Sequence, residues 1–157
     1  MAIVISLLAL LATFYQLHLQ RIHNEKSLKP LAQIDLMDRG KLLYIHIQNN
    51  GVGPLIVEKL TFFKNGKSYS SIKDCLELSP RSYQHLSITE SAKKIVLAGA
   101  YLEIFSTLFE EGDTDEEIDH ARKQLAALKL RVEGRDIYNN KVTAERDLHW
   151  FIRHGTS

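Results

Sequence analysis

The chain has one cysteine, three prolines and eight glycines among its 157 residues. A lone cysteine, Cys75, cannot form a disulfide within the chain, which excludes a secreted scaffold held by internal disulfides. The sequence also lacks His-Glu-x-x-His, Cys-x-x-Cys and Gly-x-Ser-x-Gly, the patterns of common zinc sites and of the serine-hydrolase elbow. We therefore expect no catalytic residues, no cofactor and no bound metal.

An excess of charge of one sign is absent as well. The chain contains 20 Lys and Arg against 19 Asp and Glu, and its first thirty residues hold three of the former and one of the latter. The remaining domain is therefore almost neutral. Such a domain has no electrostatic reason to bind a nucleic-acid backbone, so we expect no nucleic-acid partner.

One long hydrophobic run is present, at the N-terminus. Between Ala2 and Tyr15 only Ser6 and Thr13 are polar, and Leu17 and Leu19 extend the run. A helix from Ala2 to Leu19 would be about 27 Å long, close to the ~30 Å hydrocarbon thickness of a bilayer. We predict a transmembrane helix over residues 1–20 and a juxtamembrane linker over residues 21–30. The predicted anchor side chains are Ile3, Val4, Leu7, Leu8, Leu10, Leu11, Phe14 and Tyr15.

Two other interpretations of the run stay open, a cleaved signal peptide and a helix buried in a core or lying at an interface. A signal peptide has a basic region before the apolar stretch and a small-x-small site after it; the run shows neither. Arg21, Lys26 and Lys29 follow the run, so the positive-inside rule favours a cytoplasmic domain, with the periplasmic side as the alternative. Pro30 is expected to end the helix or its polar extension.

Residues 31–157 are predicted to form one mainly β domain. Leu43, Ile45 and Ile47 alternate with Tyr44, His46 and Gln48, as expected for a half-buried antiparallel strand. Asn65-Gly66 favours a type I′ hairpin turn. The segments expected to be strands are 31–38, 41–48, 55–64, 67–71, 83–88, 94–97, 101–108, 128–135 and 142–151. Residues 83–88 and 94–97 are expected to pair, residues 72–78 to form a short helix, and the total to be seven or eight strands.

One amphipathic helix interrupts these strands. Thr114-Asp-Glu-Glu117 matches the capping-box pattern, and Ile118, Ala121, Leu125 and Leu128 would share one face. The arrangement predicts an antiparallel β-sandwich with an inserted helix.

A short glycine-rich motif follows the second predicted strand. The run from Leu43 to Val57 contains Asn50-Gly51-Val52-Gly53-Pro54, and a later strand ends in Asp136-Ile137-Tyr138. These features resemble a family of small bacterial proteins that have an N-terminal transmembrane helix and an immunoglobulin-like domain with an Asn-x-Gly-x-Gly-Pro-Ala motif. Here Leu55 replaces the alanine. The resemblance implies a single-pass protein of the bacterial inner membrane, and it implies no particular activity.

The motif loop, Asn50, Gly51, Gly53 and Pro54, has two interpretations. Glycines can let backbone amides cradle a phosphate, but a phosphate loop leads from a strand into a helix. This loop leads into a β-branched strand. We expect a tight connection between strands.

Charged residues give two candidate interfaces. Seven carboxylates lie between Glu110 and Asp119, but a calcium loop begun at Asp113 would place Ile118 where the turn glycine belongs. A solvated helix start is expected there, with a docking surface at Glu116, Glu117 and His120 as the alternative. Lys129, Arg131 and Arg135 share one face of a strand that Glu133 interrupts. A solvated sheet face is expected there, with contact to an anionic lipid or nucleotide as the alternative.

Three further features have ordinary and functional interpretations. Asp119-His120 and Asp147-His149 could form acid/base pairs, and Cys75 could be a nucleophile only if a histidine reached it. An idle, buried thiol is the ordinary interpretation of Cys75. Trp150 is expected in the core, with an interface patch as the alternative.

The sequence therefore supports two functional hypotheses. The first is a non-enzymatic, membrane-tethered module that binds another protein or its own copies. The second is an oligomeric membrane effector, in which the domain senses a small anionic signal and the helices perturb the bilayer. Gln16, His18 and Gln20 motivate the second, because polar groups in a bilayer favour helix association.

Overall fold

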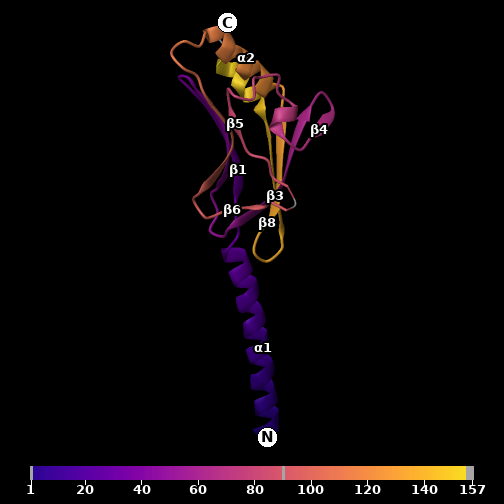
Figure 1. Cartoon of the computed structure of the whole chain (residues 1–157). Helices are drawn as coiled ribbons and strands as arrows, with labels where there is room; N and C mark the ends of the chain where they lie inside the picture. Colours follow the sequence, from indigo (N-terminus) through magenta and orange to yellow (C-terminus); the bar gives the residue numbers. More distant parts are fainter. Residues whose placement is uncertain (1, 90, 155–157) are drawn as a thin grey trace.

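The computed structural model describes residues 2–89 and 91–154. Helix α1 (Ala2–Ser27) projects from one end of a domain built of two antiparallel sheets (Figure 1). We call the end of the domain next to α1 the proximal end and the opposite end the distal end. The chain is mainly β, with one further α-helix, α2 (Asp115–Ala126), at the distal end.

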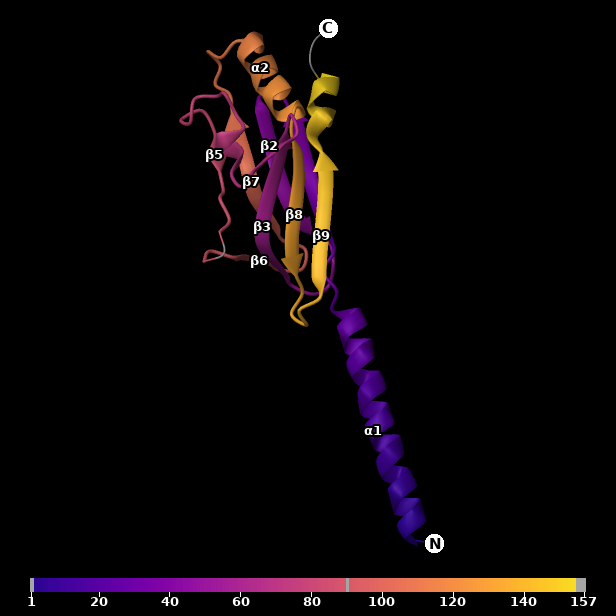
Figure 2. The ribbon, with the colours of Figure 1, turned by 90° about the vertical axis from the view of Figure 1, so that its right-hand side faces the viewer.

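The two sheets contain nine strands within the described residues. The first sheet has the order β1 (Ala32–Arg39), β2 (Leu42–Asn49), β7 (Tyr101–Leu108), β5 (Gln84–His85). The second has the order β4 (Lys67–Tyr69), β3 (Leu55–Lys64), β8 (Lys129–Arg135), β9 (Lys141–Asp147), and β6 (Lys94–Val96) pairs with β3. Figure 2 shows β3, β8 and β9 side by side, with β2 and β7 behind them.

The core lies between the sheets and follows the predicted alternation. Leu43, Ile45 and Ile47 of β2 are fully buried, whereas Tyr44 and His46 on the other face are partly exposed. From the second sheet, Leu55, Val57, Leu60, Phe62, Leu130 and Val132 complete the core. Side chains at every second position point to one face of a strand, so each sheet contributes an apolar inner face.

Helix α2 and a 3₁₀ helix, η2 (Leu148–His154), close the distal end of the core (Figure 2). Thr114 caps α2 through the predicted capping box: its hydroxyl accepts from Glu117 N, and the Glu117 carboxylate accepts from Thr114 N at 2.8 Å. Ile118, Ala121 and Leu125 are buried, which confirms the predicted apolar face.

The hairpin between β3 and β4 also has the predicted geometry. Asn65 and Gly66 have φ of 51° and 75°, and positive φ at both central residues defines a type I′ turn.

One predicted pairing is wrong, one predicted helix is shorter than expected, and the predicted number of strands is too low. The segments at 83–88 and 94–97 do not pair: β5 pairs with β7 and β6 pairs with β3, because the chain crosses from one sheet to the other between them. The predicted helix at 72–78 is only one 3₁₀ turn, η1 (Ile72–Asp74). The count of seven or eight strands is also too low, because each of the nine predicted segments contains a strand.

The last predicted strand ends earlier than expected, at Asp147. The Asp147 carboxylate accepts from His149 N at 2.7 Å and starts η2, whose three-residue period buries both Leu148 and Phe151. Trp150 is only partly buried and packs edge-on against Phe151, with ring centroids 5.4 Å apart. Phe151 is therefore the core residue of this stretch.

Helix α1 is longer than the predicted anchor and includes most of the predicted linker. The helix runs to Ser27, where Leu28 N still donates to Asn24 O. Pro30 disfavours helical geometry at Lys29, which leaves residues 28–31 as the connection to β1. The helix is long and apolar enough to cross a bilayer, and none of its residues is buried. It therefore does not pack into the core of the domain.

Candidate functional site: the junction between α1 and the domain

The connection at residues 28–31 lies against the motif loop between β2 and β3. The Lys29 carbonyl accepts from Val52 N at 3.1 Å and from Gly53 N at 3.4 Å, and Asn50 N donates to Leu31 O at 2.9 Å. The motif loop and the connection are thus joined by backbone hydrogen bonds, as neighbouring strands of a sheet are. We call this contact the junction.

The two motif glycines make this close approach possible. A Cβ on Gly53 would lie 1.8 Å from the Leu28 carbonyl oxygen, and a Cβ on Gly51 would lie 2.4 Å from both Leu31 N and Lys29 O. No side chain fits at such distances from a backbone. The glycines therefore serve as contact points for the chain that leaves α1, and the expectation of a tight strand connection accounts for only part of their role.

Asn49, the last residue of β2, is the centre of the junction. Its side chain is fully buried. Its Oδ1 accepts from Leu31 N at 3.1 Å and from Gly51 N at 3.0 Å. Its Nδ2 donates to Gly53 O at 2.8 Å and to Val96 O at 3.0 Å. One carboxamide thus uses all its bonding capacity to hold the connection, the motif loop and β6 together.

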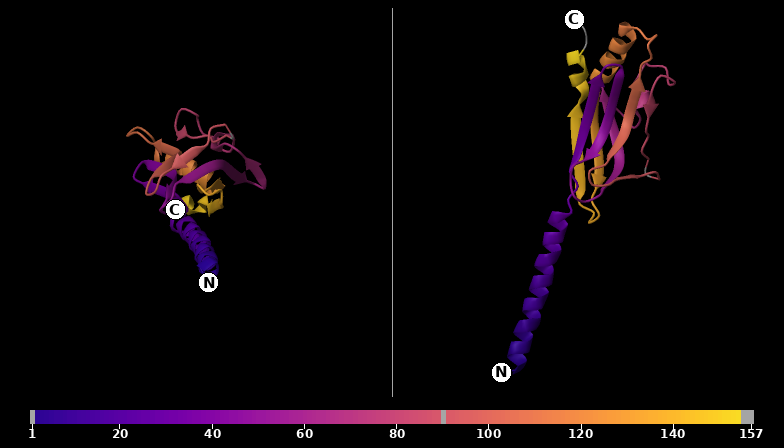
Figure 3. Two further views of the ribbon diagram at one scale, coloured as in Figure 1. Left: turned by 90° about the horizontal axis from the view of Figure 1, so that it is seen from below. Right: turned by 90° about the vertical axis from the view of Figure 1, so that its left-hand side faces the viewer.

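The turn between β8 and β9 completes the junction. Asp136 is 2% exposed, and its carboxylate accepts from Tyr138 N, from Asn140 N and from the Asn140 side chain at 2.8–2.9 Å. Burial opposes ionisation of Asp136, but these hydrogen bonds and the positive charge of Lys29 outweigh it and lower its pKa. The turn lies alongside the end of α1 in Figures 1 and 2 and in the right-hand view of Figure 3.

The junction is suited to a mechanical role. Four backbone or carboxamide contacts fix residues 29–31 on the domain, so the direction in which α1 leaves is set by the fold (Figure 3). A flexible tether would leave these groups to water.

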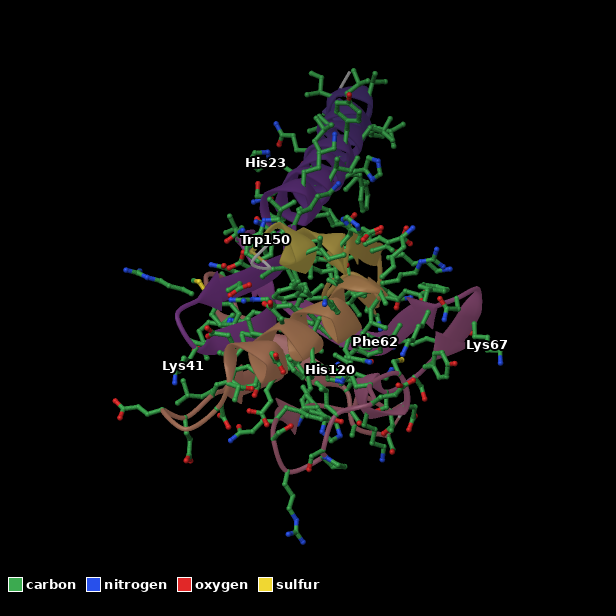
Figure 4. The ribbon with its side chains drawn as sticks, turned by 90° about the horizontal axis from the view of Figure 1, so that it is seen from above. His23, Lys41, Phe62, Lys67, His120 and Trp150 are labelled. Atoms are coloured by element: carbon green, nitrogen blue, oxygen red, sulfur yellow. The ribbon has the colours of Figure 1, made fainter. Side chains whose placement is uncertain are left out.

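The predicted acidic interface lies at the other end of the molecule. Glu116, Glu117 and His120 line a groove of about 670 Å³ between α2 and the end of β7. The groove also contains Glu77, Glu110 and Asp113, against one arginine, Arg81, and its apolar wall includes Leu108, which is 72% exposed. Figure 4 looks down on this end, with His120 on α2. We call it the distal groove.

The predicted basic stripe is separate from the distal groove and is largely neutralised. Lys129 and Arg131 both pair with Glu145, and Arg135 pairs with Glu58. Arg131 also stacks over the Phe63 ring, 5.0 Å from its centroid. The six predicted interface residues therefore do not form one surface.

The remaining candidates are a buried thiol, Cys75, and two carboxylates that accept hydrogen bonds, Asp119 and Asp147. Burial raises the pKa of the Cys75 thiol to about 11. The positive charge of Lys64 only partly opposes this effect, and the negative charge of Asp74 adds to it. Asp119 accepts from Arg122, and Asp147 accepts from the backbone of His149. Within the described residues, no three His, Cys, Asp or Glu side chains are grouped to hold a metal ion.

Sequence reasoning singled out the motif glycines, named Asn50 as the asparagine of the motif loop and gave Asp136 no role. In the structure, the side chains of Asn49 and Asp136 carry the hydrogen bonds. The signal for Asn49 was available in the sequence. Asn49 occupies the next inward-facing position of β2 after Leu43, Ile45 and Ile47, and a polar side chain that is buried there needs hydrogen-bond partners. Neither a scan of protein-family models nor a search of curated proteins found a match.

Replacing Gly53 with alanine should open the junction. The added Cβ must displace the Leu28 carbonyl or the motif loop, so we expect the full chain in detergent to lose about 2 kcal/mol or more of unfolding free energy. Gly112→Ala is the matched control, because nothing lies within 4 Å of its Cβ. Equal stability of the two variants in denaturant titrations would contradict the assignment.

Asp136→Asn should destabilise the chain in a pH-dependent way. The folded-state pKa of Asp136 is lowered, so its contribution is complete above the ordinary aspartate pKa and disappears as pH falls through the lowered value. We expect the variant to be less stable by about 1–3 kcal/mol at neutral pH. The gap should narrow on acidification, as measured by unfolding at several pH values. A difference in unfolding free energy that does not change with pH would show that the charge of Asp136 does not stabilise the turn.

Proposed function

We propose that the chain is a non-enzymatic, membrane-tethered interaction module. In this proposal α1 spans the bilayer, the junction holds the two-sheet domain in a fixed orientation on it, and the distal groove binds another protein or a second copy of the chain. The observation that carries the proposal is the junction, because a fixed orientation matters to a protein that must present one end to a partner.

The bare surface of α1 supports the membrane span. The eight predicted anchor side chains are 52–84% exposed in the isolated chain. Such a surface is stable in lipid and not in water. Arg21, Lys26 and Lys29 near its end favour the cytoplasmic side of a bacterial inner membrane for the domain, and the periplasmic side is the alternative.

The architecture supports an immunoglobulin-like domain of the resembled family. Two antiparallel sheets enclose one apolar core, and the motif loop connects a strand of one sheet to a strand of the other. Domains of this type commonly bind through the loops at one end, as proposed here.

The chemistry of the distal groove indicates the kind of partner. Five carboxylates face one arginine around an apolar wall that includes Phe109. A protein segment with basic residues beside an apolar side chain would complement both the charge and the wall. The groove lies away from α1, where such a segment could reach it from solution.

Site-specific photocrosslinking tests this proposal. A photoreactive residue at Leu108, in the groove, should capture a partner or a second copy in stoichiometric amount from intact membranes. The same residue at Lys67, on the exposed β4 hairpin, should not.

Charge reversal supplies the control for that experiment. Glu116→Lys should abolish capture at position 108, since it inverts charge in the groove. Glu111→Lys should not, because Glu111 is exposed outside the groove. A chain that stays monomeric and unlinked at position 108 under repeated conditions would refute the proposal.

A second candidate function is an oligomeric membrane effector whose domain senses an anionic signal. A second groove of about 910 Å³ favours it. Four lysines and five hydroxyls line this groove, together with three carboxylates, among them Glu58, which pairs with Lys93. The cations and hydroxyls match a small anion, and the junction would transmit its binding to α1.

Dye release from vesicles separates the two functions. An effector should empty vesicles of phosphatidylethanolamine and phosphatidylglycerol and arrest growth on overexpression. Leu8→Lys should abolish both effects, because it places a charge in the apolar span, whereas Leu8→Ile should not. Intact vesicles and normal growth with the native chain would reject the effector function.

A further inference from the structure

Exposed apolar side chains are concentrated at the proximal end of the domain. Among the described residues from position 31 onward, nine large apolar side chains are exposed, and six of them lie at this end. The six are Leu31, Val52, Ile95, Leu97, Tyr101 and Ile137, with exposures of 51–68%. Single exposed apolar residues are ordinary, but a group on one end marks a contact surface.

The placement of these residues relates them to α1. Val52 is at the tip of the motif loop and Ile137 is in the turn between β8 and β9. Both segments belong to the junction, and the turn lies alongside the end of α1 (Figures 2 and 3). Val52 and Ile137 therefore lie at the end of the domain from which α1 leaves, next to the bilayer that α1 would cross, whereas Tyr101 stacks on His46 on the outer face of the first sheet.

The exposed charges at the proximal end are positive, like those that follow the apolar part of α1. Lys29, Lys94 and Lys141 are exposed there. Of the carboxylates near them, Asp136 is buried under its hydrogen bonds and Glu58 pairs with Lys93 and Arg135, while Glu133 lines the same groove as Lys141. Apolar tips surrounded by lysines are the pattern of surfaces that enter an anionic lipid interface.

The length of α1 places this end within reach of headgroups. The residues after Leu19, Gln20–Ser27, span about 12 Å at ~1.5 Å per residue, while the headgroup layer extends about 5–8 Å beyond the hydrocarbon. A helix tilt of about 20°, acting across a sheet roughly 20 Å wide, lowers one side of the domain by about 7 Å. The apolar span of about 27 Å is also slightly short for the ~30 Å hydrocarbon, which draws the domain inward.

We infer that the proximal end is a lipid-contacting surface, in which Val52 and Ile137 enter the headgroup layer and Lys94 and Lys141 bind anionic phospholipid headgroups. The occupant is the bilayer that α1 itself crosses, so this inference rests on the membrane span in the proposed function. Contact at this surface sets the angle between the domain and the membrane. The direction of the distal groove would then depend on lipid composition.

Depth-dependent fluorescence quenching tests the inference in the full chain. Single labels that report on lipid are placed at Val52→Cys and Ile137→Cys, in a Cys75→Ala background, in vesicles of phosphatidylethanolamine and phosphatidylglycerol. A quencher on the lipid headgroup should reduce the emission of both labels severalfold. Labels at Leu108→Cys and Ile152→Cys, exposed at the distal end, should be unaffected, because ten-residue β3 separates them from the bilayer by roughly 30 Å.

The lysines are tested in the same vesicles. Combining Lys94→Gln with Lys141→Gln should reduce quenching at position 137 severalfold. In phosphatidylcholine vesicles, which lack net charge, the double substitution should change nothing.

A label at Leu10→Cys, quenched from the lipid tails, distinguishes the possible failures. Quenching at position 10 without quenching at 52 and 137 would overturn the inference and leave the proposed membrane span standing. No quenching at position 10 would overturn both. Crosslinks between Val52→Cys copies without lipid quenching would assign the surface to a second copy and also overturn the inference.

Discussion

The buried carboxamide of Asn49 links four parts of the chain: β2, to which it belongs, and the three segments to which it bonds. It bonds to the connection from α1 at Leu31, to the motif loop at Gly51 and Gly53, and to β6 at Val96. Asn49 ends a strand of the first sheet, and β6 pairs with β3 of the second, so the same side chain also links the two sheets. A buried amide with any of these bonds unmade would be costly, which makes the arrangement nearly all-or-none.

The direction of α1 follows from that interaction, and the two ends of the domain acquire different roles. The proximal end carries the fixed connection, the apolar tips and the exposed lysines. The distal end carries α2, which closes the core and forms one wall of an acidic groove. The Arg122 guanidinium fastens α2 to the first sheet by bonding both oxygens of Asp38 at 2.8 Å. The hydrogen bond to Asp38 raises the pKa of Arg122; burial opposes this effect, and the bond to Asp119 contributes a smaller rise.

Much of this architecture could be predicted from local patterns. The alternation in β2, the Asn65-Gly66 turn and the Thr114 capping box each depend on interactions within a few residues, and the structure has all three. The pairing of short β5 and β6 depends on which sheet each strand joins, and a three-residue strand contains too little pattern to specify that. The continuation past Asp147 failed for a different reason. Leu148, Trp150 and Ile152 fit the alternation of a strand, whereas Leu148 and Phe151, three residues apart, fit the 3₁₀ period that the structure has.

The junction was harder to predict than the fold, because its parts lie far apart in sequence. The glycines were visible, but their purpose depends on backbone from residues 28–31 arriving beside them. Asp136 and Lys29 are brought together only by the complete topology. The most direct test of the account is the distance distribution between spin labels at Arg21 in α1 and Lys67 on the β4 hairpin, measured by pulsed electron paramagnetic resonance on the full chain in lipid nanodiscs. A rigid junction predicts one narrow distribution, which broadens when Gly-Ser residues are inserted between Lys29 and Pro30. A distribution that is already broad in the native chain would contradict it.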